Sequence, residues 1–123
     1  MNTPVRCAAL LGCLAVMLGA FGAHGLEGRV SEKAIEVWLT ANRYHFFHAL
    51  AVLAVGFAQG LGLRHTQWSL RFWSAGLMLF SGALYLYAIT GLKFAAMVAP
   101  LGGLSFAAGW LCLLKTSFSP EED

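Results

Sequence analysis

The sequence predicts an all-α membrane protein, an antiparallel four-helix transmembrane bundle with a short interfacial helix between spans one and two. Two observations lead to this prediction. Of the 123 residues, 59% are hydrophobic and 11% are charged, whereas about 25% of a soluble domain is charged. In addition, four uncharged runs reach the ~17–25 residues that a membrane-crossing helix needs. We therefore expect residues 1–123 to form a single transmembrane domain.

The four predicted spans contain no Asp, Glu, Lys or Arg. They cover about residues 7–23, 46–63, 72–89 and 95–114. A charge at the centre of a spanning helix costs ~2.5–3.5 kcal/mol, so its absence favours insertion. The runs also lack the period-two alternation of barrel strands, and a helix satisfies its own backbone hydrogen bonds in lipid. Short connections between the later spans predict antiparallel neighbours.

A polar segment at about 27–43 separates the first two spans. Ser31 is placed to cap a helix, and Ile35, Trp38 and Leu39 recur at helical spacing. The pattern predicts an amphipathic helix on the membrane surface, with continuation into span two as a variant. A solvated loop is the alternative.

Charge and cysteine content exclude several classes of protein. The net charge of +2 is too small for a nucleic-acid footprint, so we expect no nucleic-acid partner. The three cysteines, Cys7, Cys13 and Cys112, lie in apolar runs at spacings that fit neither a zinc site nor a disulfide framework. No nucleophile, phosphate loop or pair of acids appears, so we expect no enzymatic activity.

Small residues are predicted to mediate the packing of the spans. Helices in lipid gain most from close backbone approach, which glycine and serine permit. Recurrent small positions in spans one and four, and a weakly polar side of span three, indicate a tightly packed bundle. The expected packing positions are Gly12, Gly19, Gly22, Ser81, Gly82, Pro100, Gly102, Gly103 and Gly109.

Histidines and tyrosines are expected at one membrane boundary. The predicted topology places His24 at the end of span one, His45 and His48 at the start of span two, and Tyr85 near the end of span three. Imidazoles there could bind a metal, ligate a haem, relay protons or hydrogen-bond a quinone. Alternatively, they hold neighbouring helices together by hydrogen bonds.

Four motifs carry a resemblance to a known family. They are LGAFGAHG at 18–25, Tyr44-x-x-x-His48-Ala-Leu-Ala, LFSGALY at 79–85 and PLGGLSFAAGW at 100–110. In this order they resemble the YgdD/YwdK family, small bacterial inner-membrane proteins of uncharacterised function with eukaryotic relatives. The resemblance implies four transmembrane helices and no established activity.

The resemblance also narrows the candidate site. His24 and His48 match the family pattern, whereas His45 lies outside it. A cofactor-binding site would therefore use His24 and His48, with Tyr44 and Tyr85, and a metal would use His24 and His48 alone. The resemblance further implies that both termini face the cytoplasm. Lys and Arg do not decide this, because they divide equally between the two sides of the predicted bundle.

These observations support three functional hypotheses. The first is a helix-packing accessory or helper protein of a larger membrane complex, or a homo-oligomer, in the bacterial inner membrane, with no cofactor. The second is a histidine-based module that binds a metal, haem or quinone. The third is a small transporter or channel, which would need a water-lined path along weakly polar groups such as Ser74, Ser81, Gln59 and His48.

Overall fold

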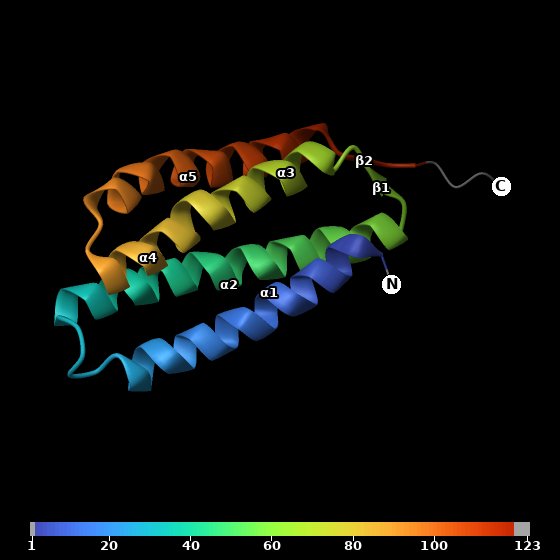
Figure 1. The fold of residues 1–123 in the computed structure, drawn as a ribbon. Coiled ribbons are helices and arrows are strands. Elements are labelled where there is room, and N and C mark those ends of the chain that lie inside the picture. The colour runs from blue at the N-terminus through green and yellow to red at the C-terminus, as the bar shows by residue number, and fades with distance from the viewer. Residues whose placement is uncertain (1, 120–123) are drawn as a thin grey trace.

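The computed structural model describes residues 2–119, which form four helical rods packed side by side (Figure 1). The structure is therefore all-α, as the sequence predicts. The first rod is α1 with its π-helical end η1, the second is α2, the third is α3, η2 and α4, and the fourth is α5 with η3. Their bounds are α1 Thr3–Ala20, η1 Phe21–Gly25, α2 Glu32–Gly60, α3 Gln67–Gly76, η2 Leu77–Gly82, α4 Ala83–Thr90, α5 Lys93–Cys112 and η3 Leu113–Lys115.

Helix α1 begins with a cap that also joins it to α2. The side chain of Asn2 accepts a hydrogen bond from the backbone N–H of Val5 at 3.1 Å. Its amide nitrogen donates to the carbonyl of Gly56 on α2 at 2.7 Å. Because Gly56 lies near the end of α2, this contact places the start of one rod beside the end of the next.

Helix α2 runs without a break from Glu32 to Gly60. Ser31 caps it through a 3.1 Å bond from the N–H of Ala34, at the position predicted from the sequence. The expected interfacial helix is therefore not a separate element, because residues 32–43 form the first part of α2. One buried face continues through both parts, and no helix-breaking residue separates them.

The third and fourth rods are joined by a tight turn. Gly91 ends α4 in the left-handed conformation, with φ of 70°, which glycine adopts without strain. Within the third rod, the π-helical segment η2 replaces α-helical turns between α3 and α4. Pro100 lies inside α5 and is exposed.

Glycines mark the closest approaches between rods. A Cβ on Gly102 of α5 would collide with the backbone of Phe80 on η2, and one on Gly109 would collide with the indole of Trp73 on α3. In the same way, Gly22 lies against the indole of Trp38. These positions therefore set how near the rods can lie.

Gly19 also lies close to a neighbouring rod, whereas the remaining predicted glycines lie in looser surroundings. A Cβ on Gly19 would lie 2.8 Å from Oδ1 of Asn42, a side-chain contact. Gly82 and Gly103 would make ordinary contacts, and Gly12 would meet nothing within 4 Å. Space at Gly12 is therefore not needed for packing within this chain.

A two-residue ribbon joins the chain's last described residues to the connection between α2 and α3. Strand β1, Leu63–Arg64, pairs antiparallel with β2, Ser117–Phe118. This pairing and the even number of rods leave the start of α1 and strand β2 at the same end of the bundle (Figure 1).

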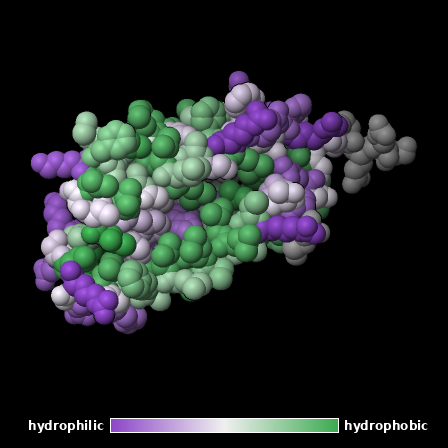
Figure 2. All heavy atoms as spheres, in the orientation of Figure 1, coloured by the Kyte–Doolittle hydropathy of each residue, from purple (hydrophilic) through white to green (hydrophobic). Residues whose placement is uncertain are grey.

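The outer surface is dominated by apolar side chains, which form a broad hydrophobic belt with hydrophilic groups mainly at the two ends (Figure 2). Within residues 2–119, three helices are long and apolar enough to cross a membrane. They are Thr3–Gly25, Gln67–Thr90 and Lys93–Lys115. Such a belt is typical of a protein surrounded by lipid, because the hydrocarbon core of a bilayer contacts apolar side chains.

Candidate functional site

The interior contains two polar clusters on different sides of α2. In the first, His48 lies among aromatic rings from α3 and α5. Its ring stacks on Phe106 with centroids 3.7 Å apart, and Trp73 and Trp110 approach it edge-on. We call His48, Trp73, Phe106 and Trp110 the aromatic cluster.

Both nitrogens of His48 are engaged. Nδ1 lies 2.8 Å from the carbonyl of Tyr44, one turn earlier in α2, so it carries the proton and donates it. Nε2 then accepts a hydrogen bond from the indole N–H of Trp110 on α5 at 3.0 Å. This arrangement fixes a neutral imidazole with no free lone pair, so His48 is not available to a metal without rearrangement.

The second cluster joins α1, α2 and α4 through one amide. The side-chain nitrogen of Asn42 donates to the carbonyl of Ala15 on α1 at 2.7 Å and to the hydroxyl of Tyr85 on α4 at 3.1 Å. The same hydroxyl lies 2.9 Å from Nδ1 of His45. We call Asn42, His45 and Tyr85 the amide cluster, and Trp38 borders it, with its indole 4.5 Å from the Tyr85 ring.

The hydrogen bonds of the amide cluster have a direction. An amide N–H can only donate, so the hydroxyl oxygen of Tyr85 accepts from Asn42. The hydroxyl proton of Tyr85 is then free to be donated to Nδ1 of His45. In that neutral tautomer the proton of His45 lies on Nε2, so this series of hydrogen bonds ends at an N–H donor.

Nε2 of His45 has no hydrogen-bond partner although it is buried. A backbone group of Leu11 lies close to the imidazole, at a geometry outside the limits of a hydrogen bond. The hydroxyl of Ser81 on η2 is also buried without a partner. Ser69 Oγ and Trp73 Nε1 share that condition deeper between α3 and α5. Such groups are rare in folded proteins, since each costs about 1–3 kcal/mol.

A cavity of about 270 Å³ lies between α1 and the third rod. Figure 2 shows a hollow with a hydrophilic floor in this otherwise apolar face. Its lining includes two of the four residues with unpartnered groups, His45 and Ser81, together with Tyr85. The remaining lining residues are Leu11, Leu14, Leu18, Leu77, Met78 and Gly82.

The structure separates His24 from His48, against the expectation of a shared boundary. Trp38 donates to the carbonyl of Leu18 at 2.8 Å, which sets the antiparallel register of α1 and α2. From that contact, His24 continues toward the loop, whereas His48 lies farther along α2 in the opposite direction. The expectation was wrong because α2 begins at Glu32, so His48 lies in mid-helix rather than at a helix start.

The two predicted tyrosines also lie apart. Tyr85 belongs to the amide cluster. Tyr44 stays partly exposed and packs its ring against Phe80 of η2, with centroids 4.7 Å apart. His24 is exposed near the end of the first rod. Tyr44 also lies beside His48, with ring centroids 6.5 Å apart, so the four residues predicted to bind a cofactor are divided among three places. Residues 2–119 contain no group of three His, Cys, Asp or Glu able to hold a metal.

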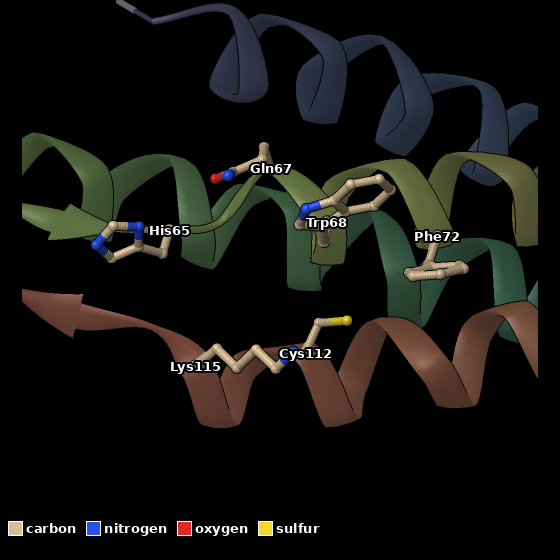
Figure 3. Close-up of a pocket in the computed structure, with 6 residues that line it drawn as sticks. All are labelled: His65, Gln67, Trp68, Phe72, Cys112 and Lys115. Carbon is tan, nitrogen blue, oxygen red and sulfur yellow. The ribbon is translucent and has the colours of Figure 1, made fainter.

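Another cavity, of about 520 Å³, opens between α3 and α5 near the β1–β2 ribbon (Figure 3). His65 and Lys115 lie toward one end of it, and Trp68, Phe72 and Cys112 line the rest. None of the predicted site residues lines this cavity.

A charged groove accompanies the first part of α2. Arg43 lines it together with Lys33, Glu36 and Thr40, and Leu84 of α4 forms the opposite wall. Arg43 follows Asn42, whose partner Ala15 lies near the middle of the apolar Thr3–Gly25 helix. The backbone of Arg43 therefore lies at a depth where the neighbouring rod is apolar.

Sequence reasoning missed Asn42 and dismissed His45. The signal was present: Trp38, Asn42 and His45 recur at intervals of three and four, so they share one helix face. If this helical pattern is extended past Arg43, it predicts one continuous helix with a polar face. Helix α2 has this form.

Comparison with known proteins places this arrangement in a family. A family profile described as "Protein of unknown function (DUF423)" matches residues 18–103, which include both polar clusters apart from Phe106 and Trp110. The chain belongs to the DUF423 family. The match confirms the resemblance noted from the motifs.

Curated relatives of this DUF423 protein are bacterial membrane proteins. A UPF0382 membrane protein of Staphylococcus haemolyticus is 39% identical over 113 residues, which cover 89% of this chain and 93% of the relative. The UPF0382 membrane protein YwdK of Bacillus subtilis is 42% identical over 110 residues, covering 86% and 88%. No solved structure matches. The DUF423 chain is accordingly a small bacterial membrane protein.

Proposed function

We propose that this DUF423 protein is a helix-packing accessory protein of a larger complex in the bacterial inner membrane, without enzymatic activity of its own. Its rigid bundle would present a fixed apolar surface to a membrane partner. The proposal extends the family assignment, which specifies a membrane protein and no activity.

The observation that carries the proposal is the use of polar side chains as ties between rods. Trp38 binds the carbonyl of Leu18, Asn42 binds that of Ala15, and Ser105 binds that of Phe72 at 2.6 Å. His48 and Trp110 tie α2 to α5 in the same way. Polar groups engaged in this manner stabilise helix association in lipid and leave few groups free for chemistry.

We further propose that α2 is a fourth span and that both termini face the cytoplasm. Helix α2 packs between α1 and α4, and its side chains Asn42 and His45 face these neighbours rather than lipid. Single cysteines at residues 24 and 116, in a chain without its own three cysteines, test the topology by labelling with an impermeant maleimide. Labelling of residue 24 from outside the cell and of 116 only after lysis supports it, and the reverse pattern contradicts it.

Affinity purification in mild detergent tests the accessory role. The full chain, tagged and expressed at its native level, is expected to bring a defined set of larger membrane proteins with it. An unrelated four-span protein of similar abundance is the control for carry-over in micelles. Recovery of the DUF423 chain alone, or only with proteins that the control also recovers, would contradict the proposal.

A further inference from the structure

The cavity between α1 and the third rod combines features that packing does not explain. Its walls are apolar, yet two residues that line it, His45 and Ser81, each have a buried polar atom without a partner, Nε2 and Oγ. His45 is 4% exposed and Ser81 2% exposed. The two residues come from different rods, α2 and η2, and line the same cavity.

We propose that this cavity binds an apolar membrane molecule through a carbonyl oxygen. When the hydroxyl of Tyr85, which accepts from Asn42, donates its own proton to Nδ1 of His45, the imidazole proton lies on Nε2 and this nitrogen is a donor. The hydroxyl of Ser81 supplies a second donor. One carbonyl oxygen has two lone pairs and accepts from both.

The lining decides against a charged ligand. None of the residues around the cavity carries a formal charge at neutral pH, since the only titratable groups are an imidazole and a phenol. Burying an ion there without a counter-charge costs far more than burying a hydrogen-bonded carbonyl. A neutral headgroup joined to an apolar chain therefore fits this site.

The size limits the part of the ligand that enters. About 270 Å³ lies just below the ~300–1,000 Å³ range of common ligand pockets, so it admits a headgroup and not a whole lipid. Two membrane molecules supply such a carbonyl: the ring of a prenyl quinone and the ester group of a diacyl lipid. In either case the apolar chain would leave between α1 and η2 toward the bilayer.

Entry requires a side-chain movement. Nε2 of His45 and Oγ of Ser81 are both covered in this structure, and leucines of α1 line the cavity. Leucine rotamer changes are fast compared with ligand binding, so they present a small barrier. The π-helical turn of η2 forms the opposite wall, and such turns are frequent at functional sites.

Binding of a short-chain prenyl naphthoquinone tests the proposal. Trp38 lies beside Tyr85, so a bound quinone is expected to quench tryptophan fluorescence of the detergent-purified full chain in a saturable manner. His45→Leu and Ser81→Ala should each weaken binding at least fivefold. Ser74→Ala is the matched control, because the Ser74 hydroxyl is exposed and bonds its own helix at Leu70.

A second variant separates loss of the site from loss of the fold. Gly82→Leu fills the cavity from its wall and leaves both donors in place. It is expected to abolish quenching with an unchanged thermal unfolding midpoint and helix content. If Gly82→Leu unfolds, Met78→Trp, an exposed position in the same wall, replaces it.

Native mass spectrometry of the protein with phosphatidylglycerol provides the other arm. The site is supported if the wild type binds only the quinone or retains only the lipid, and if the His45 and Ser81 variants lose that binding. Which of the two binds identifies the source of the carbonyl. Absence of both in the wild type overturns the proposal. Equal binding by the wild type, His45→Leu and Ser81→Ala also overturns it.

Discussion

His45 and His48 lie one turn apart on α2 and are equally buried, each 4% exposed, yet their surroundings are opposite. His48 gives its proton to a backbone carbonyl, accepts the indole of Trp110 and stacks on an aromatic ring. His45 has one partner, Tyr85, and a second nitrogen that bonds nothing. Burial alone therefore does not distinguish a structural histidine from one available to a ligand, whereas hydrogen-bond satisfaction does.

The contrast extends to the rods that each histidine joins. The aromatic cluster closes the contact between α2 and the α3–α5 pair, where large rings fill the space. The amide cluster ties α1 to α2 and α4 with small polar groups and leaves a cavity beside it. The two sides of α2 thus combine a filled interface with an open one.

The largest effect is expected from His48→Ala, which would break the aromatic cluster. The change empties the space between Phe106 and Trp110 and leaves the indole N–H without an acceptor. By analogy with other large-to-alanine changes in cores, the free energy of unfolding should fall by about 2–5 kcal/mol. Thermal unfolding in detergent, followed by circular dichroism, measures it. Stability equal to the wild type would contradict a structural role for His48.

Asn42→Leu should have the next largest effect, on the other side of α2. It removes the donor to Ala15 and to Tyr85 while keeping a similar side-chain volume. Interhelical hydrogen bonds in membrane proteins contribute about 0.6 kcal/mol on average and up to about 1.7. Combining it with Tyr85→Phe in a double-mutant cycle isolates the coupling. Additive losses from the two changes would show that the amide and the hydroxyl act independently.

His45→Leu should change the free energy of unfolding by less than about 1 kcal/mol, despite the same burial as His48. It removes one hydrogen bond to Tyr85 but also removes a buried donor that has no partner, and these terms oppose each other. Equilibrium unfolding in mixed micelles gives the value. A loss of stability as large as that of His48→Ala would contradict the proposed difference between the two histidines.

The smallest effect is expected at Gly12, outside both clusters. A Cβ there meets nothing, so Gly12→Ala should leave stability unchanged or raise it by up to about 1 kcal/mol through helix propensity. Gly22→Ala, where Trp38 blocks a Cβ, is the matched comparison and should destabilise. The same unfolding assay ranks the two. A marked loss at Gly12 would indicate that this face packs against another chain.

The sequence predicts the helical class and the cap at Ser31, because hydrophobic length and capping are local properties. It predicted the full extent of α2 only as a variant, in which the interfacial helix continues into span two. The spans were defined by the absence of charge, and Arg43 interrupts the apolar run at a point where the helix continues. Because span two was predicted to start near residue 46, His48 was expected at the membrane boundary, beside His24. In the structure it lies in the middle of α2.

The partner choices of the polar side chains could not be derived in the same way. Asn42 bonds a backbone carbonyl of α1, and no sequence pattern marks one carbonyl among others. The glycines behave similarly: Gly102 and Gly103 are adjacent, yet only Gly102 meets the backbone of Phe80 closely. The rotation of each rod about its own axis determines these contacts, and that rotation depends on packing against all the neighbouring rods.

The depth of Arg43 has a consequence for the bilayer itself. Long basic side chains extend toward the nearest headgroups, and water and phosphate are drawn inward to meet them. The leaflet beside the first half of α2 should therefore be thinner than the leaflet beside α5, where the apolar helix is longer. A protein that deforms its membrane on one flank attracts others that share the same mismatch, before any specific contact forms between them.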